Sequence, residues 1–186
     1  MEFLVVGLGN PGDKYTNNRH NLGFMVIDRL AKKKGLRLNK KKFKSIYGNT
    51  VHNDDKIHFI KPLTYMNKSG EAVKEIKNFY KIPVENIIVI HDEMDLQPGK
   101  IKIKSGGGSA GHNGLRSITG DLGTGDFIRV RIGVGKPLDK SGRTGFLLSD
   151  FSKNEEETVD ESIEKASEAV WEIITNSTPA AMNKFN

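Results

Sequence analysis

Apolar residues recur along this chain at two spacings, one typical of buried strands and one typical of amphipathic helices. The run FLVV at 3–6 ends at glycines, and the run IIVI at 87–90 is β-branched, so both predict buried strands. Further strands are predicted at 45–51 and 57–61, which flank the polar turn HNDD, and at 100–104 and 127–134, where apolar and polar residues alternate.

Helical spacing appears in three other segments. Residues 21–35 place apolar side chains on one face and end in three lysines and a glycine, which suit the C-terminus of a helix. Residues 69–80 repeat that pattern, and Ser152 with Glu155 makes a capping box for a long helix. Because strands and helices alternate, we predict a single α/β hydrolytic domain over residues 1–186, with a mixed twisted sheet surrounded by helices.

Polar residues stand where several of these strands end. Asn10 follows the first strand, Asn67 follows the strand at 57–61 by a short loop, and Asp92 closes the strand that begins with IIVI. Strands joined by helical crossovers are parallel, so their carboxyl ends meet at one edge of the sheet. Ligands of open α/β sheets bind at that edge, and we expect a functional crevice there.

The composition excludes some chemistry and leaves a nucleic-acid partner open. The chain has no cysteine, which excludes disulfides, thiolate nucleophiles and cysteine-ligated zinc. No apolar stretch is as long as a membrane span, and no basic residues precede the N-terminal apolar run, so we expect a cytoplasmic protein without a membrane partner. A net charge of +6 suits an acidic partner such as nucleic acid, although many basic proteins bind none.

The glycines at positions 7, 9 and 12 have the spacing of a dinucleotide-binding fingerprint, and we interpret this match as a false positive. The fingerprint requires a helix to begin within the glycines, so that its N-terminus faces the pyrophosphate. Here the polar segment DKYTNNR follows, and helical periodicity resumes only near residue 20. We therefore expect no nicotinamide or flavin cofactor.

His20 precedes the first predicted helix and is the candidate base. A carboxylate such as Asp92 could bond one ring nitrogen, fix the tautomer and leave the other nitrogen free to accept a proton. The helix dipole lowers an imidazole pKa and Asp92 raises it, so the sequence leaves the net direction open. Without a cysteine or a serine in a nucleophile elbow, water is the natural nucleophile. Metal ligation by His91, Asp92, Glu93 and Asp95 is disfavoured, because adjacent strand residues point to opposite faces.

Three asparagines each have a structural and a chemical interpretation. Asn10 precedes a proline in a turn, while Asn67 and Asn113 are placed to cap the helices that follow them. Amides on three loops of one crevice could also donate hydrogen bonds to a carbonyl oxygen that becomes an oxyanion. Both interpretations stay open.

Glycines and basic residues adjoin this crevice. The segment Gly106–Gly108 suits a phosphate cradle or a simple turn. Lysines alternate in KIKIK just before it, and Arg129 and Arg131 alternate in the next predicted strand. These charges predict either a phosphate clamp or a solvated edge that lysine protects from aggregation.

The chain resembles the bacterial peptidyl-tRNA hydrolase family in four segments that occur in the same order: VGLGNPGDKYTNNRHNLGF, KPLTYMNKSG, VIHDEMDLQPGKIKIKSGGGSAGHNGLRSI and RVRIGVGKP. The similarity runs from residue 3 to about residue 150. It implies a monomeric, metal-independent esterase of translation and ribosome rescue, which binds the acceptor stem and 3′ end of peptidyl-tRNA. The implied fold is a mixed sheet surrounded by helices.

The resemblance also implies roles for individual residues. His20 would be the base, Asp92 its orienting carboxylate, and Asn10 the residue that distinguishes blocked from free aminoacyl groups. Residues that would contact the peptide or the tRNA are Tyr15, Tyr65, Met66, Asn67, Asn113, Lys104 and Arg131, the last two through phosphate. The family often has Phe where Tyr65 stands, and the segment after residue 176 departs most and receives no role.

Together these features give one mechanistic hypothesis. His20 would take a proton from water that attacks the ester carbonyl between the peptide and the tRNA 3′ ribose, releasing free tRNA and peptide. Asparagine amides and backbone N–H groups near Gly111 would stabilise the oxyanion. A nucleotide-dependent enzyme and a noncatalytic RNA-binding protein are the alternatives.

Overall fold

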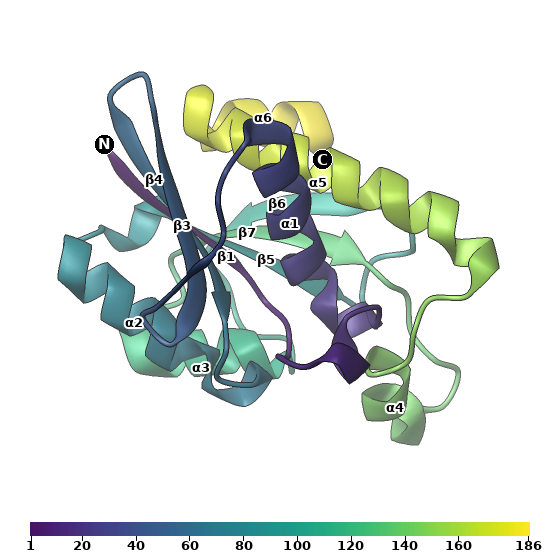
Figure 1. The fold of residues 1–186 in the computed structure, drawn as a ribbon. Coiled ribbons are helices and arrows are strands. Elements are labelled where there is room, and N and C mark those ends of the chain that lie inside the picture. Colours follow the sequence, from purple (N-terminus) through teal and green to yellow (C-terminus); the bar gives the residue numbers. More distant parts are fainter.

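The computed structural model describes residues 1–186, and its centre is a seven-stranded mixed sheet (Figure 1). The strand order across the sheet is β2-β3-β4-β1-β5-β7-β6. The strands are β1 (Glu2–Gly7), β2 (Lys40–Lys42), β3 (Ser45–His52), β4 (Asp55–Pro62), β5 (Ile87–Glu93), β6 (Ile101–Ser105) and β7 (Ile128–Gly133).

Helices cover both faces of this sheet, which confirms the predicted α/β architecture (Figure 1). Alternate residues of β1 serve the two sides: Phe3 and Val5 pack toward α1, α5 and α6, whereas Leu4 and Val6 pack toward α2 and α3. The helices are α1 (Leu22–Lys34), α2 (Ser69–Tyr80), α3 (Asn113–Leu122), α4 (Arg143–Leu147), α5 (Glu156–Thr175) and α6 (Thr178–Phe185).

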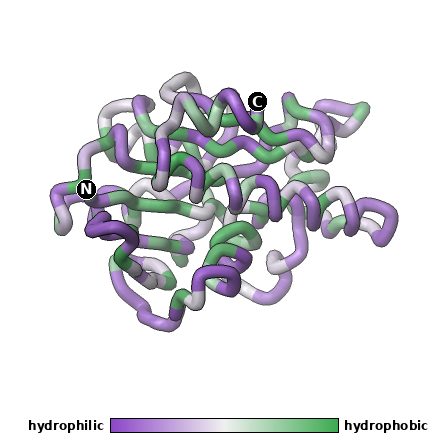
Figure 2. Tube along the Cα trace, turned by 90° about the horizontal axis from the view of Figure 1, so that it is seen from above, coloured by the Kyte–Doolittle hydropathy of each residue, from purple (hydrophilic) through white to green (hydrophobic).

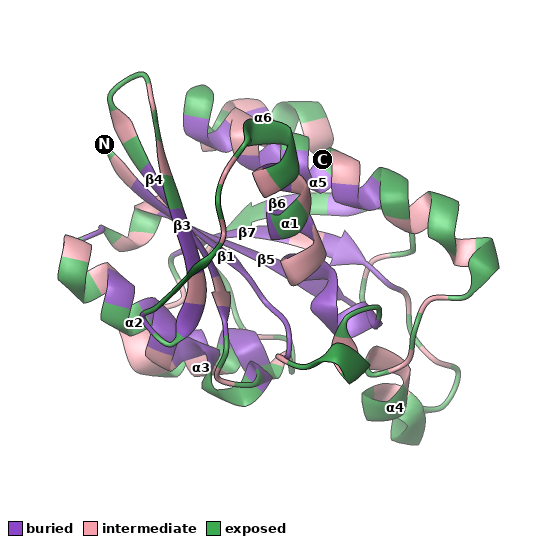
Figure 3. Ribbon diagram, viewed as in Figure 1, coloured by how far each residue is buried: buried purple, intermediate pink, exposed green.

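Burial explains why the central strands are so apolar. The sheet is buried and apolar along its centre, and exposed polar positions lie on the outer helix faces and loops (Figures 2 and 3). A strand that is covered on both sides cannot alternate with polar residues, because each would be buried without a partner. No helix is both long enough and apolar enough to cross a membrane.

The sheet brings the predicted crevice together as expected. Strands β4, β1, β5 and β7 are parallel, so their carboxyl ends lie at one edge. Gly7 serves close packing there: a β-carbon on it would overlap the carbonyl oxygen of Gly23 in α1. Only two 3₁₀ turns, Asp13–Tyr15 and Arg19–Asn21, lie between these glycines and α1, which begins at Leu22. The geometry required for the dinucleotide fingerprint is therefore missing, as predicted.

Several short elements were not predicted, because their sequences carry no apolar periodicity. β2 consists of three exposed lysines at the sheet edge, and α4 contains no buried residue. At the other edge α6 covers β6, and the side chain of Asn186 exchanges two hydrogen bonds with the backbone of Ile103. The C-terminal segment thus satisfies backbone groups that an edge strand would leave open.

Candidate active site

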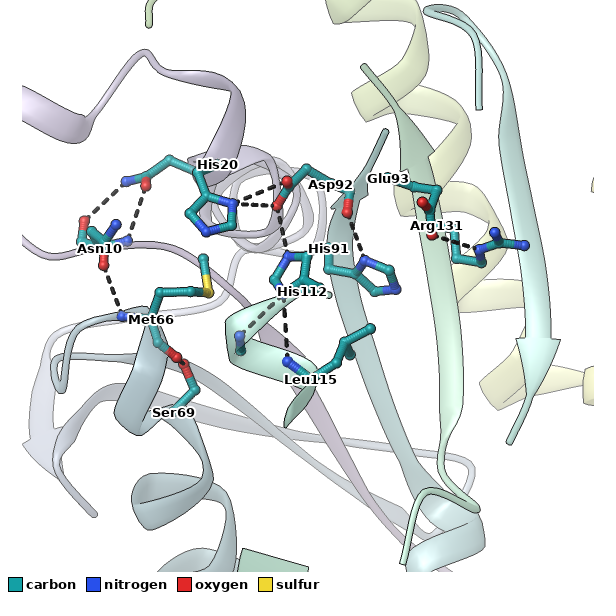
Figure 4. A network of polar contacts seen from close by, with 12 residues as sticks. Asn10, His20, Met66, Ser69, His91, Asp92, Glu93, His112, Leu115 and Arg131 are labelled. Atoms are coloured by element: carbon teal, nitrogen blue, oxygen red, sulfur yellow. Dashed lines mark hydrogen bonds and ion pairs between the residues drawn. The ribbon is translucent and has the colours of Figure 1, made fainter. Parts of the chain in front are cut away.

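His20 and Asp92 meet at the carboxyl edge of the sheet, as predicted. Asp92 lies at the end of β5, and His20 lies in the 3₁₀ turn that leads into α1. His20 Nδ1 lies 2.9 Å and 3.0 Å from the two carboxylate oxygens of Asp92, and these residues are only 7% and 2% exposed (Figure 4). A proton on Nδ1 is therefore donated to Asp92, and Nε2 carries a free lone pair.

The environment of His20 favours a base of raised strength. Burial lowers the pKa of His20, but the charge of Asp92 and the hydrogen bond to it outweigh burial, so the pKa is raised above its usual value. Nε2 has no hydrogen-bond partner in the protein, and this atom is accessible to solvent. His20 thus presents an accessible acceptor at its second nitrogen, which is what a general base requires.

A second imidazole, His112, holds the same carboxylate, and the sequence analysis missed it. Its Nε2 lies 2.9 Å from Asp92 Oδ1 (Figure 4). Its Nδ1 accepts from the backbone N–H groups of Gly114 and Leu115, at 3.1 Å and 3.4 Å, so His112 is the N-cap of α3. Because those donors occupy Nδ1, the ring proton lies on Nε2 and is donated to Asp92.

The metal site considered from the sequence is not assembled. His91 points into the core, where its Nδ1 donates to the carbonyl of Asp92 at 2.7 Å, and burial lowers its pKa to about 3. The only acidic and imidazole groups close enough to share an ion are His20, Asp92 and His112. Since backbone donors keep the proton of His112 on Nε2, that nitrogen has no lone pair for a metal. The donor set does not fit a tightly held cation.

Asn10 forms one side of the site and is rigidly held. Its side-chain Oδ1 accepts from the backbone N–H of Met66 at 2.7 Å (Figure 4). Its backbone exchanges two hydrogen bonds with the side chain of Asn21, at 2.9 Å and 3.0 Å. These contacts join the loop after β1 to the turn before α2 and to the residue after His20. Asn10 is therefore fixed in place while its Nδ2 group makes no hydrogen bond within the protein.

A pocket of about 50 Å³ opens beside His20 and Asp92, with room for a water molecule. Gly111 and Asn113 line it from the loop before α3, and Leu147 lines it from α4. The N–H of Gly111 has no acceptor in the protein. A residue with an unpaired donor thus lines the same pocket as the candidate base.

Arg19, another residue that the sequence analysis missed, anchors the turn that carries His20. Its guanidinium donates to both oxygens of Glu155, at 2.8 Å and 2.9 Å, and to the carbonyl and hydroxyl of Ser149, at 3.2 Å and 2.8 Å. It also lies 4.5 Å and 5.0 Å from the ring centres of Phe146 and Phe151. This buried arginine joins the His20 turn to the segment that brings Leu147 to the pocket.

The structural interpretation of two asparagines was wrong. His112, not Asn113, caps α3, and Asn67 lies in a 3₁₀ turn (Met66–Lys68) ahead of α2. Both side chains are exposed and form no hydrogen bond within the protein. The capping explanation therefore does not account for them, and their amides are free.

The two tyrosines expected to contact substrate lie outside the hydrogen-bond network of His20, Asp92 and His112. Tyr15 lies in the 3₁₀ turn after β1, half-buried, with the ammonium of Lys14 over its ring. Tyr65 is 57% exposed and adopts a positive φ of 55° next to the buried Met66. Neither tyrosine makes a polar contact with His20 or Asp92.

The basic strands β6 and β7 differ from the prediction at one position. Lys104 is exposed, and Arg131 donates to Glu93 at 3.1 Å while remaining partly exposed. Arg129 is only 3% exposed, and its guanidinium donates to the carbonyls of Gly107 and Gly108. The expectation that Arg129 shares a solvated or phosphate-binding face was therefore wrong, because this side chain holds the glycine loop in place.

Sequence patterns alone gave little indication of His112 and Arg19. The segment SAGHNG resembles a turn before a helix, but histidine is an uncommon N-cap and its contact with Asp92 spans 20 residues. Arg19 is surrounded by polar residues in the sequence and acquires its role from partners 130 to 136 residues away. Both contacts become visible only when the chain is folded.

Similar proteins agree on one family. The family model described as "Peptidyl-tRNA hydrolase" matches residues 4–186. The peptidyl-tRNA hydrolases of Thermoanaerobacter sp. (strain X514) and Clostridium botulinum (strain Alaska E43 / Type E3) are 50% and 48% identical to this chain over 184 residues. These matches cover 99% of this chain and 99% and 95% of those proteins.

The fold gives the same result. The crystal structure of peptidyl-tRNA hydrolase from Acinetobacter baumannii superposes with a TM-score of 0.93 at 41% identity, covering 99% of this chain and 94% of that one. The residues matched by the family model, 4–186, include His20 and Asp92. This chain belongs to the peptidyl-tRNA hydrolase family.

Proposed function

We propose that this protein hydrolyses the ester bond between a peptide, or an N-blocked aminoacyl group, and the 3′ ribose of tRNA. The observation that carries the proposal is a buried His20–Asp92 pair, 2.9 Å apart, whose free imidazole nitrogen is accessible beside a pocket that can hold water. Family membership supplies the substrate class. Residues 1–186 would act as one hydrolytic domain, a monomer that functions in translation and ribosome rescue in the cytoplasm.

The proposed reaction has two proton transfers. His20 Nε2 takes a proton from water as the oxygen attacks the ester carbonyl carbon, and the carbonyl oxygen becomes an oxyanion. Asp92 stabilises the imidazolium through the proton on Nδ1. When the intermediate collapses, the C–O bond to the ribose breaks, and His20 returns the proton to the leaving hydroxyl. The products are a peptide carboxylic acid and tRNA with a free 3′ end.

Donors for the oxyanion are available at the rim of the pocket. Gly111 and Asn113 line the pocket, and neither the N–H of Gly111 nor the amide of Asn113 has an acceptor in the protein. The amide of Asn67 is also free, in the 3₁₀ turn before α2. One such donor is worth roughly 2.7–4 kcal/mol of transition-state stabilisation in other enzymes. Met66 would line the path of the peptide, and Tyr15 and Tyr65 would contact substrate at the rim.

We further propose that catalysis needs no metal. The tautomer of His112 is the support, since its Nε2 proton is committed to Asp92. The test is multiple turnover of N-acetyl-aminoacyl-tRNA with excess EDTA, using a purified protein dialysed against chelator. We expect full hydrolysis. A noncatalytic RNA-binding protein would give none, and a metalloenzyme would lose its activity.

Asn10 would distinguish blocked from free aminoacyl groups. Its place is fixed by Met66 and Asn21, and its Oδ1 accepts one hydrogen bond, from the N–H of Met66. The second lone pair of Oδ1 could accept from the peptide N–H of a blocked substrate, whereas a solvated ammonium would gain little from a neutral amide. Asn10→Ala should lower the ratio of kcat/KM for N-acetyl-aminoacyl-tRNA over free aminoacyl-tRNA by about tenfold, a change of ~1.4 kcal/mol. An unchanged ratio would show that Asn10 only shapes the turn and does not distinguish the two substrates.

The tRNA would approach over β6 and β7. Lys104 is exposed there, and Arg131 keeps part of its guanidinium accessible beside Glu93. Phosphate contacts from such residues release counterions, so binding should weaken as salt increases.

A further inference from the structure

A buried cation next to His20 has no role in the proposed reaction. Arg19 is 7% exposed and does not line the catalytic pocket, so it touches neither the water nor the ester in that mechanism. We infer that Arg19 is a positioning residue: with Glu155 it holds the turn that carries His20, and thereby the imidazole, in the orientation that proton transfer requires. This inference rests on the proposed function and adds a residue that acts through another.

The side-chain hydrogen bonds of Arg19 all run to one segment, residues 146–155, which leads from α4 to α5. Its Nη2 donates to both carboxylate oxygens of Glu155, and its Nη1 lies within hydrogen-bond distance of oxygens of Ser149 and Asp150. A bidentate contact between a planar guanidinium and a carboxylate fixes direction as well as distance. The ammonium of a lysine is a point charge and could not hold this arrangement.

The partners of Arg19 are themselves held in place. Glu155 also accepts hydrogen bonds from the backbone N–H and the hydroxyl of Ser152, at 2.8 Å and 2.9 Å, in the capping box before α5. Burial raises the pKa of Glu155, but the bonds from Ser152 and the contact with Arg19 outweigh burial, so the pKa lies below its usual value. The backbone N–H of Arg19 also donates to the carbonyl of Ser149, at 3.2 Å. Arg19 is therefore attached to a rigid point at the start of α5.

His20 lies between two such attachments. On one side Arg19 joins the turn to α5, and on the other side Asn21 exchanges two hydrogen bonds with the backbone of Asn10. The contact between His20 and Asp92 connects this turn to β5, so its geometry depends on how firmly the turn is held. A displacement of about 1 Å at a catalytic group can cost about 10²-fold in rate. Loss of the Arg19 contacts should therefore impair the base although both members of the pair are still present.

The charges around His20 make this geometry measurable. Asp92 on β5 raises the pKa of His20 against the effect of burial. The other titratable groups that line the pocket are Glu93 on β5 and His112 in the loop before α3, whose ring centre lies 4.9 Å from that of His20. A ring that moves away from Asp92 stays buried but loses the main cause of its raised pKa, so the pKa of His20 should fall.

Hydrolysis of N-acetyl-aminoacyl-tRNA, at matched concentrations of folded full-length protein, tests the inference. Arg19→Lys keeps the charge and loses the bidentate contact, and Glu155→Gln keeps the shape and loses the negative charge. Each should lower kcat by about tenfold and leave KM within about twofold, because only the base is displaced. Arg19→Lys, which changes no charge, should also move the acid limb of the pH profile of kcat/KM to lower pH.

Arg29→Lys is the matched control, because Arg29 makes a comparable bridge to α5 from a position about two turns into α1. Its guanidinium pairs with Asp160 and with Glu164, the latter at 2.8 Å. This variant should leave kcat and the acid limb unchanged. An equal loss of kcat in Arg29→Lys would show that any weakened link to α5 has this effect, and it would overturn the inference.

The double variant, Arg19→Lys with Glu155→Gln, should lose little more kcat than either single variant, because all three lack the same contact. Additive losses, or an unmoved kcat and acid limb in Arg19→Lys, would overturn the inference. If urea titration shows that Arg19→Lys does not fold, Glu155→Gln carries the test, and an unchanged kcat in that variant would overturn the inference as well. Failure of the unmodified protein to hydrolyse the substrate would instead overturn the proposed function.

Discussion

Two buried histidines, each paired with a carboxylate, lie toward opposite ends of this sheet, and only one has the geometry of a base. At the carboxyl end of β5, Asp92 lies between the rings of His20 and His112. Near the start of β1, His58 lies between the Glu2 carboxylate and the Tyr47 hydroxyl, at 3.0 Å and 2.9 Å. In the first network the carboxylate has two partners, and in the second the imidazole has two partners.

This difference determines the chemistry of each histidine. Both nitrogens of His58 are occupied, and burial, its largest influence, lowers its pKa despite Glu2, whose side chain is partly exposed. His20 has one free nitrogen, and the fully buried Asp92 raises its pKa. An imidazole and a carboxylate in contact are therefore insufficient for a general base, which also needs an open nitrogen and a carboxylate that solvent does not screen.

Removal of each imidazole should give the largest difference in effect between the two networks. His20→Ala should lower kcat by about 10³- to 10⁴-fold while tRNA binding and folding persist, because only the proton acceptor is lost. His58→Ala, the control, should lower the free energy of unfolding and leave kcat near normal at a temperature where the protein is folded. Single-turnover hydrolysis on matched protein concentrations measures both. Near-normal turnover by His20→Ala would eliminate the proposed mechanism.

Loss of the carboxylate charge should have the next largest effect. Asp92→Asn should lower kcat by about 10²-fold, since the imidazole remains but can adopt the wrong tautomer. In the unmodified protein kcat/KM should fall as the pH decreases through the raised pKa of His20, because protonation removes the base. Without the Asp92 charge, burial lowers that pKa, and the acid limb of the profile should move to lower pH. Glu2→Gln should leave the limb in place, and an unmoved limb in Asp92→Asn would contradict the proposed pairing.

Two substitutions of His112 should separate its two roles. His112→Asn retains a side chain that can cap α3, whereas His112→Ala loses the cap and about 1 kcal/mol of stability. Both remove the second N–H donor of Asp92 and should lower kcat by about tenfold, or ~1.4 kcal/mol. Asp92 would then bind the proton of His20 more strongly, so the acid limb should move to higher pH. A purely structural role would leave the limb of His112→Asn unchanged.

Sequence patterns predicted the sheet because its strands are apolar by necessity. The covered strands β1 and β5 must be almost wholly apolar, and α1 and α2 must present one apolar face. The spacing of apolar residues therefore predicts where these elements lie in the sequence. The His20–Asp92 pair was predictable because parallel strands share one edge. β2 and α4 were not, since exposed elements carry no such constraint.

The remaining parts of the site depend on long-range contacts that no local pattern encodes. Arg129 has the alternating spacing of a surface residue, yet β7 turns it toward the carbonyls of the glycine loop, where desolvation is offset by hydrogen bonds. His112 similarly gains its role from Asp92, 20 residues away. Charge and spacing could not distinguish a buried guanidinium from an exposed one.

The smallest effect on turnover should come from the hydroxyl groups of the second network. Because Nε2 of His58 donates to Glu2, its Nδ1 accepts from the Tyr47 hydroxyl, which lies 3.2 Å from the Tyr80 hydroxyl. Tyr47→Phe leaves a buried nitrogen without a donor and should lower the free energy of unfolding by about 1–3 kcal/mol in urea titrations. Tyr80→Phe removes only the outer donor and should cost less, about 0.5–1.5 kcal/mol. Neither variant should change kcat/KM, because this network is remote from the reacting centre. A change in turnover that exceeds the change in folded fraction would mean that the two networks are coupled through the sheet.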